Sequence, residues 1–262
     1  MVQTRSPSKH QRPAGTGVAL VAGFLIQAAL LRLLLISGRI DIGAASMAGL
    51  IYCLAAGLVW RHVDLPRFGL ANTVTTLRGA MIAVLPSLLL TPGSFDPTLS
   101  WAVIIFGLLA LAMDGLDGRL ARRLNESSAF GARFDMEVDA AFVLFLSGAV
   151  AAAGRAGPWI LLAGLMRYLW VGAALIWPLL RGPVPPSLFR KSVCVILLLL
   201  LLLGLAPVVP SGGAALPCAV GLVLLLASFG RDLLWLMRNA SGTGDDQVTA
   251  VLYDGAVPME SE

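Results

Sequence analysis

The residues best suited to chemistry are four aspartates that stand in two closely spaced pairs, Asp114 with Asp117 and Asp135 with Asp139. Residues three or four apart lie on the same face of an α-helix, so each pair presents two carboxylates together. Ionised carboxylates in apolar surroundings are unfavourable unless a cation or hydrogen bonds compensate them. The spacing therefore predicts a cation-binding site.

The type of ligand indicates the type of metal. Carboxylate oxygens suit hard divalent cations such as Mg²⁺ or Mn²⁺, whereas Zn²⁺ prefers His or Cys, and neither occurs in this segment. We expect two ions about 4 Å apart, the usual arrangement for displacement at phosphorus. One alternative stays open, in which the aspartates merely form ion pairs with nearby arginines. These arginines are Arg119, Arg122, Arg123 and Arg133.

Small residues share the helix faces of the aspartates. Gly118, Ala121 and Gly131 are spaced from the aspartates by whole helical turns. A larger side chain there would fill space that a nucleotide needs, and glycine lets a phosphate approach the backbone. Arg122 follows as a fixed cation suited to phosphate oxygens. We expect these residues to bind a nucleotide diphosphate.

The chain that positions this site is strongly apolar. Of its 262 residues, 58% are hydrophobic and 13% are charged, and its mean hydropathy is +0.85. Its apolar stretches are long enough to cross a hydrocarbon core of about 30 Å. We predict an all-α integral membrane protein without a separate soluble domain. The expected spans lie near 17–37, 43–60, 72–91, 100–122, 130–153, 157–178, 191–209 and 214–236.

The distribution of basic residues predicts the orientation. Fifteen of the 19 Lys and Arg residues fall on one side of the predicted spans, against Arg39 and Arg155 on the other. Loops rich in Lys and Arg stay cytoplasmic, so both termini and the aspartates should face the cytoplasm. The bases are dispersed rather than gathered in one stripe, which excludes nucleic-acid binding. Spans four and five should be antiparallel neighbours that bring both aspartate pairs together.

The segment of the aspartates resembles a known signature. The pattern is Asp114-x2-Asp117-Gly118-x2-Ala121-Arg122-x8-Gly131-x3-Asp135-x3-Asp139. It resembles the complete motif of the CDP-alcohol phosphatidyltransferase family, with eight fixed residues over 26 positions. Upstream, Asn72-x2-Thr75-x2-Arg78 is similar to the start of that family's core. The resemblance covers about 72–236 and implies a six-helix core preceded by two additional transmembrane helices.

The resemblance also implies roles for residues. The four aspartates would hold the metals, and Asp139 would act as general base toward the acceptor hydroxyl. Gly118, Ala121, Arg122 and Gly131 would line the CDP site. The enzyme would be a homodimer that transfers a phosphatidyl group from a CDP-linked lipid, such as CDP-diacylglycerol, to an alcohol. CMP would be released, as a step of phospholipid biosynthesis.

Other charged residues are candidates for the acceptor site. Arg167 lies within a span, without an acid nearby in sequence, which makes it a candidate to line a cavity. With Arg190 and Lys191 it could receive a polyol phosphate such as glycerol 3-phosphate or an inositol phosphate. Glu137 points away from the aspartates and follows Arg133 by four residues, which predicts an ion pair between them. Further candidates at the start of the core are Asn72, Thr75 and Arg78.

Two other functions stay open. An intramembrane prenyltransferase would also bind a diphosphate through aspartates and Mg²⁺, but would lack the Asp-Gly-x-x-Ala-Arg element. An ion-coupled transporter would spread its acids along a pathway.

The expected segments are a basic mobile tail (1–16), two extra helices (17–60), a surface segment (61–71), the catalytic core (72–238) and an acidic mobile tail (239–262).

Overall fold

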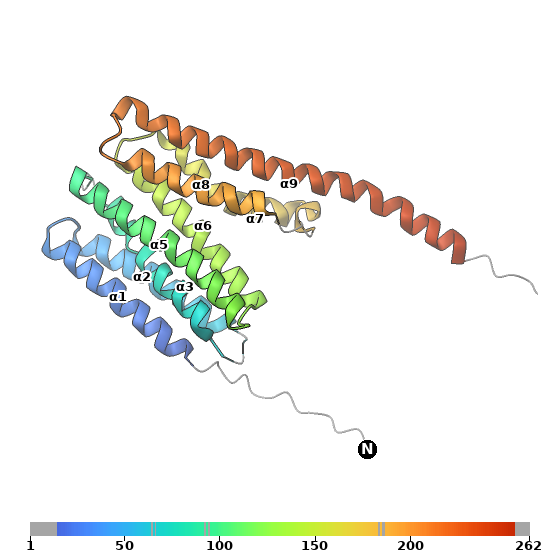
Figure 1. Ribbon diagram of the computed structural model, residues 1–262, viewed down its shortest axis with the longest axis horizontal. Helices are drawn as coiled ribbons and strands as arrows, with labels where there is room; N and C mark the ends of the chain where they lie inside the picture. Colours follow the sequence, from blue (N-terminus) through green and yellow to red (C-terminus); the bar gives the residue numbers. More distant parts are fainter. Residues whose placement is uncertain are drawn as a thin grey trace, which may run out of the picture.

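A computed structural model of the protein describes residues 15–254, apart from 64, 66, 92, 94, 183, 185 and 186, and without the side chains of 188 and 240–254. The described residues form a bundle of helices (Figure 1). These are α1 (Thr16–Ile36), α2 (Ile42–His62), α3 (Gly69–Ile82), α4 (Leu85–Leu89), α5 (Pro97–Arg123), α6 (Ala129–Ala152), η1 (Pro158–Ile160), α7 (Leu161–Ile176), η2 (Pro178–Arg181), α8 (Leu188–Leu205) and α9 (Ser211–Asp254). Each predicted span is helical, which confirms the all-α fold class.

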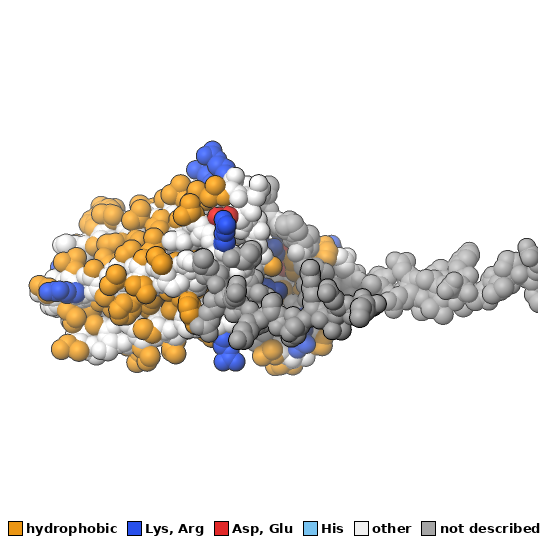
Figure 2. All heavy atoms as spheres, turned by 90° about the horizontal axis from the view of Figure 1, so that it is seen from below, with side chains coloured by type: hydrophobic (Ala, Val, Ile, Leu, Met, Phe, Trp, Pro, Cys, Tyr) orange, Lys and Arg blue, Asp and Glu red, His pale blue; other side chains and the backbone are white. Residues whose placement is uncertain are grey.

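The helices have the length and composition of membrane spans. Among the described residues, five segments are long and apolar enough to cross a bilayer, namely α1, α2, α5, the continuous stretch Pro158–Ile176, and Ser211–Asn239 within α9. Hydrophobic side chains cover much of the described surface in Figure 2, and charged side chains on that face are few and scattered. The protein is therefore a multi-pass membrane protein.

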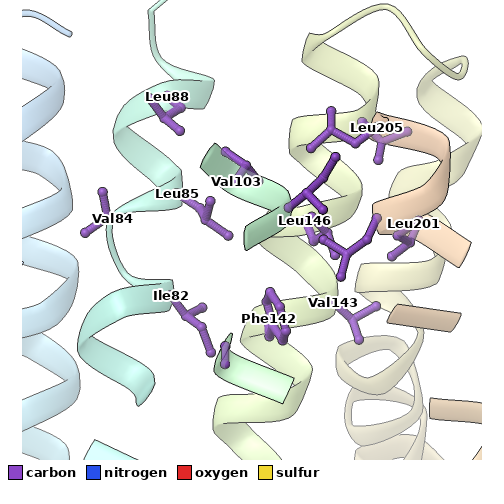
Figure 3. Packing of buried hydrophobic residues seen from close by; sticks show 14 of the residues in the cluster. Ile82, Val84, Leu85, Leu88, Val103, Phe142, Val143, Leu146, Leu201 and Leu205 are labelled. Atoms are coloured by element: carbon purple, nitrogen blue, oxygen red, sulfur yellow. The ribbon is translucent and has the colours of Figure 1, made fainter. Parts of the chain in front are cut away.

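A buried apolar core joins the helices that carry the aspartates to their neighbours. Leu85 of α4, Val103 of α5, Leu146 of α6 and Leu201 of α8 belong to one cluster of buried side chains (Figure 3). Phe142 of α6 is in the same cluster and lies three residues after Asp139. The core thus fixes α6 directly beside the candidate site.

Side-chain caps set where the two aspartate-bearing helices begin. Asp96 accepts a hydrogen bond from the backbone N–H of Leu99 at the start of α5, and Ser128 accepts one from Gly131 at the start of α6. These are the positions at which a helix has unpaired N–H donors. The Leu99 N–H and the side chain of Arg39 hold the pKa of Asp96 below its usual range. Both helices therefore start at fixed residues, which sets the rotation of their aspartate faces.

The span predicted over 72–91 is broken into two helices. Helix α3 ends at Ile82 and α4 begins at Leu85, with Pro86 in its first turn. Proline has no N–H to donate, and its ring would collide with the carbonyl four residues earlier, that of Ile82. The proline therefore disfavours a regular helix at this point, and the segment expected to span over 72–91 consists of two helices, α3 and α4.

The two additional N-terminal helices support α3 at this break. The Ser87 N–H bonds the Val84 carbonyl, not the Ala83 carbonyl that a continuous helix would use. The buried Gln27 side chain of α1 instead donates to the Ala83 carbonyl at 3.0 Å, and to Ala48 of α2 at 2.9 Å. One amide thereby ties α1, α2 and the end of α3 together, which gives the extra helices a structural role.

The predicted basic tail lies almost entirely outside the described residues, and the predicted acidic tail (239–262) lies partly outside them. Of the basic tail 1–16, the structure describes only the last two residues. Helix α9 runs on to Asp254, past the end of the last predicted span near residue 236, and residues 255–262 are not described. The division of the chain into five segments stays a prediction.

Candidate active site

Three helices, rather than the predicted two, form the candidate site. Helix α3 packs against both α5 and α6, whereas direct contacts between α5 and α6 are sparse. The prediction that the aspartate-bearing helices are direct neighbours was therefore wrong in this respect, since α3 lies against both. Sequence proximity suggested direct packing, but α3 supplies polar side chains that the carboxylates need.

The four aspartates converge, although not equally. Asp114 of α5 and Asp135 and Asp139 of α6 each offer a carboxylate oxygen, and these atoms lie within 4.8 Å of one another. Asp117 is the most buried of the four, with 3% of its surface exposed. It accepts a 2.9 Å hydrogen bond from the Thr75 hydroxyl of α3. Three carboxylates thus gather closely, and the fourth is held by α3.

Arg78 of α3 lies at the centre of this cluster. Its Nη1 donates to Asp114 at 3.0 Å and to Asp139 at 2.6 Å, and its Nη2 bonds Asp135. The same Nη2 lies 3.6 Å from Asp117. Arg78 is thus the cation in every ion pair that the described residues form with these aspartates.

The alternative based on nearby arginines is not supported. The aspartates pair with an arginine from a distant part of the chain. The arginines of their own segment all have exposed side chains in the structure. They are Arg119, Arg122, Arg123 and Arg133.

The start of α3 is held by the segment between the two aspartate helices. Glu126 accepts a hydrogen bond from the Ala71 N–H at 3.2 Å, and so satisfies an unpaired donor of the first helical turn. Asn72 donates to the Phe68 carbonyl. Its Oδ1 would lie 2.8 Å from a Cβ added at Gly131. Sequence reasoning did not single out Glu126, because a helix cap from so far along the chain has no local signal.

The residues expected to bind CDP have different surroundings. At Gly118 an added Cβ would meet only the Nη1 of Arg122, at an ordinary 3.6 Å, so this face of α5 has free space. Gly131, in contrast, is in close contact with Asn72. Ala121 is half-buried and Arg122 is exposed. Free space for a nucleotide is therefore found on α5 rather than on α6.

The residues predicted to receive an anionic acceptor have acidic partners. Arg167 bonds Glu137 of α6, so the predicted pair between Glu137 and Arg133 was wrong. Arg190 pairs with Asp232 of α9 at 2.9 Å. Lys191 is exposed. These cations do not join the ion pairs of the aspartate cluster, and two of them are already neutralised.

One cysteine lies near the site. Cys194 of α8 is half-buried, and α8 packs against α5, which carries Asp114, and against α6, which carries Asp139. Spacing alone could not indicate this, because the thiol comes from another helix. Helix α8 therefore lies beside the two helices that carry the aspartates.

Comparisons with known proteins match the part of the chain that contains the aspartates. A family model described as CDP-alcohol phosphatidyltransferase matches residues 68–227. The chain is 32% identical over 94 residues to cholinephosphotransferase 1 of Danio rerio, covering 34% of this chain. It is 33% identical over 117 residues to ethanolaminephosphotransferase 1 of Mus musculus, covering 39% of this chain. These matches span only 24% and 29% of the two relatives. No solved structure matches the chain significantly.

Proposed function

This chain belongs to the CDP-alcohol phosphatidyltransferase family, and we propose that it transfers a substituted phosphate group from a CDP-activated donor to an alcohol. CMP is released, and the product is a membrane phospholipid. The observation that carries the proposal is the convergence of Asp114, Asp135 and Asp139, whose oxygens lie within 4.8 Å of one another. These acids gather at one end of the bundle instead of along a pathway, which argues against an ion-coupled transporter.

The donor atoms at the site suit divalent metal ions. Three carboxylates from two helices form an all-oxygen ligand set, which Mg²⁺ and Mn²⁺ prefer. Asp114, Asp135 and Asp139 would hold the metal, with Asp117 as the fourth ligand of a two-ion site. Such ions would supply charge neutralisation for the diphosphate and for the departing CMP.

The chain's own residues perform the remaining steps. Asp139 accepts the proton of the alcohol hydroxyl as that oxygen attacks phosphorus, because a positioned carboxylate is a suitable general base. Gly118 and Ala121 leave room for the nucleotide along α5. Arg122 donates to diphosphate oxygens, for which its planar guanidinium is well suited. Gly131 assists indirectly, by letting Asn72 approach the start of α6.

The polar head group is an amino alcohol in this proposal. The relatives named above are a choline and an ethanolamine phosphotransferase, and they favour such a head group over the polyol phosphates expected from the sequence. The pairing of Arg167 with Glu137 and of Arg190 with Asp232 points the same way, because a cation neutralised by an acid attracts an anionic acceptor less. CDP-choline or CDP-ethanolamine would then be the donor, and a lipid alcohol the acceptor.

Orientation and assembly remain part of the proposal. The excess of Lys and Arg on one side of the spans supports cytoplasmic termini and a site that opens to the cytoplasmic leaflet. A site at this interface would admit both a soluble and a lipid substrate. We keep the homodimer implied by the family resemblance as an expectation.

One assay tests the reaction and the head group together. Purified protein is incubated with Mg²⁺ and either CDP-choline or CDP-ethanolamine with diacylglycerol, or CDP-diacylglycerol with glycerol 3-phosphate or an inositol phosphate. CMP release and the mass of the lipid product are measured. We expect CMP and an amino-alcohol phospholipid. A polyol product would refute the head group, and an absence of CMP with every pair would refute the transferase.

The general base has its own test, with a matched control. Asp139→Asn should abolish nearly all turnover while the CDP donor still binds. Glu137→Gln removes an acid from the same helix, but Glu137 bonds Arg167 and is 55% exposed, so this variant should keep its turnover. Near-normal CMP release by Asp139→Asn would refute the assignment.

A further inference from the structure

Arg78 bonds the same three carboxylates that gather into the candidate metal site. Nη1 bonds Asp114 and Asp139, and Nη2 bonds Asp135. Those three residues are also the ones whose oxygens lie within 4.8 Å of one another. We propose that Arg78 is a displaceable counter-cation, which neutralises the aspartates in the metal-free protein and competes with divalent ions for them.

The charges explain why the metal-free site needs such a cation. The Arg78 side chain is 1% exposed, and the Asp117 side chain is 4% exposed. An acid as buried as Asp117 is strongly unfavourable without a partner, whereas the three carboxylates that Arg78 bonds are 28–39% exposed. One guanidinium against four carboxylates leaves an excess of negative charge, so the site still attracts divalent ions. Arg78 therefore compensates part of the negative charge of the carboxylates and leaves the rest for a divalent ion.

The guanidinium itself is incompletely satisfied in this arrangement. Its Nε is buried, and no acceptor meets it among the described residues. A buried donor without a partner destabilises the arrangement that contains it. The position of Arg78 is thus held by the carboxylates at its other end and not by a full set of hydrogen bonds. A cation that binds the carboxylates more strongly would displace it.

This inference rests on the metal site of the proposed function. It predicts whether removing the charge of Arg78 raises or lowers the affinity for the metal. If Arg78 competes with the metal, removing its charge strengthens metal binding. If Arg78 instead orients the carboxylates for the metal, as outer-shell partners often do, removing it weakens binding. Electrostatics favours competition, because a unit charge within a few ångströms strongly repels a divalent ion.

The test measures the binding of Mg²⁺ and Mn²⁺ to the full chain in detergent by calorimetry, and thermal stability without metal. Arg78→Met should bind the metal about tenfold more tightly or better, and should unfold at a lower temperature when metal is absent. Arg78→Lys keeps the charge but cannot span three carboxylates, so its affinity should lie between those of Arg78→Met and the unchanged protein. Arg78→Lys also tests the competition if Arg78→Met does not fold.

The matched control is Arg155→Met. Arg155 donates to the carbonyls of Gly204, Ala206 and Val209, away from the aspartates, so its loss should lower stability without changing the metal affinity. If both Arg78 variants bind the metal no more tightly than the unchanged protein, Arg78 does not compete with the metal. That result would not affect the proposed function, which CMP release by the unchanged protein tests. If the unchanged protein binds no metal, the competition fails, and the CMP assay then decides the proposed function separately.

Discussion

The Thr75 hydroxyl of α3 donates a 2.9 Å hydrogen bond to the Asp117 carboxylate of α5. Asp117 is almost fully buried, so few other donors can reach it. Thr75 also approaches the Ala71 carbonyl at 3.1 Å, and a hydroxyl has one proton for the two acceptors. The charged acceptor should hold that proton, because hydrogen bonds to ionised groups are the stronger ones. Thr75 therefore positions Asp117.

Thr75→Val tests this bond, since valine keeps the shape and removes the hydroxyl. We expect metal affinity and turnover to fall by about 10- to 100-fold, as for other outer-shell partners of metal ligands. Thr75→Ser keeps the donor and should retain most of the activity. The Mg²⁺ dependence of CMP release is the measurement, and an unchanged dependence in Thr75→Val would contradict the role.

Gly118 and Gly131 should respond differently to alanine. At Gly131 a Cβ would lie 2.8 Å from Asn72 Oδ1 and 3.0 Å from Ser128 Oγ, so Gly131→Ala should lose about 1–3 kcal/mol of stability through overpacking. At Gly118 the nearest atom is 3.6 Å away. Gly118→Ala should fold as well as the unchanged chain or better, because alanine favours helix, but its KM for the CDP donor should rise. Thermal unfolding and donor titrations separate the two effects, and a normal KM in Gly118→Ala would show that no nucleotide lies there.

Helix α7 contains a glycine that packing requires and one that it does not. A Cβ at Gly164 would collide with the backbone Cα of Leu144 in α6, whereas a Cβ at Gly172 would meet nothing within 4 Å. Gly164→Ala should therefore destabilise the protein by about 1–3 kcal/mol, or more if α7 must shift. Gly172→Ala is the control and should be neutral or slightly stabilising. Equal unfolding temperatures of the two variants would disprove close packing of α7 on α6.

Gln27 should matter more for stability than its place in an extra helix suggests. Gln27→Met keeps a similar volume but removes the donor to the buried Ala83 carbonyl. A buried acceptor without a partner costs about 1–3 kcal/mol, so unfolding in detergent should occur at a lower temperature. Ser37→Ala removes an exposed hydrogen bond just after the same helix and should change little. If Gln27→Met and Ser37→Ala unfold at the same temperature, the hydrogen bonds of Gln27 do not stabilise the packing of these helices.

Local patterns predicted much of this molecule. Apolar length indicated the helices, and the spacing of Asp135 and Asp139 placed both on one face, because helical periodicity is a local property. Pro86 also carried a local signal for the break after α3, although the apolar run concealed it. Contacts between distant segments could not be predicted in this way. Arg78 meets Asp139 across 61 positions, and Arg167 meets Glu137 across 30, and such pairs depend on how whole helices pack.

The central place of Arg78 has a consequence for how the protein is made. Synthesis proceeds from the N-terminus, and early segments form structure first. Helix α3 therefore reaches the bilayer before α5 and α6, which bring the aspartates. Each acid then finds a partner already present as it enters the membrane, before any metal ion binds. The order of helices along the chain thus spares the nascent protein a cluster of unpaired charges during insertion.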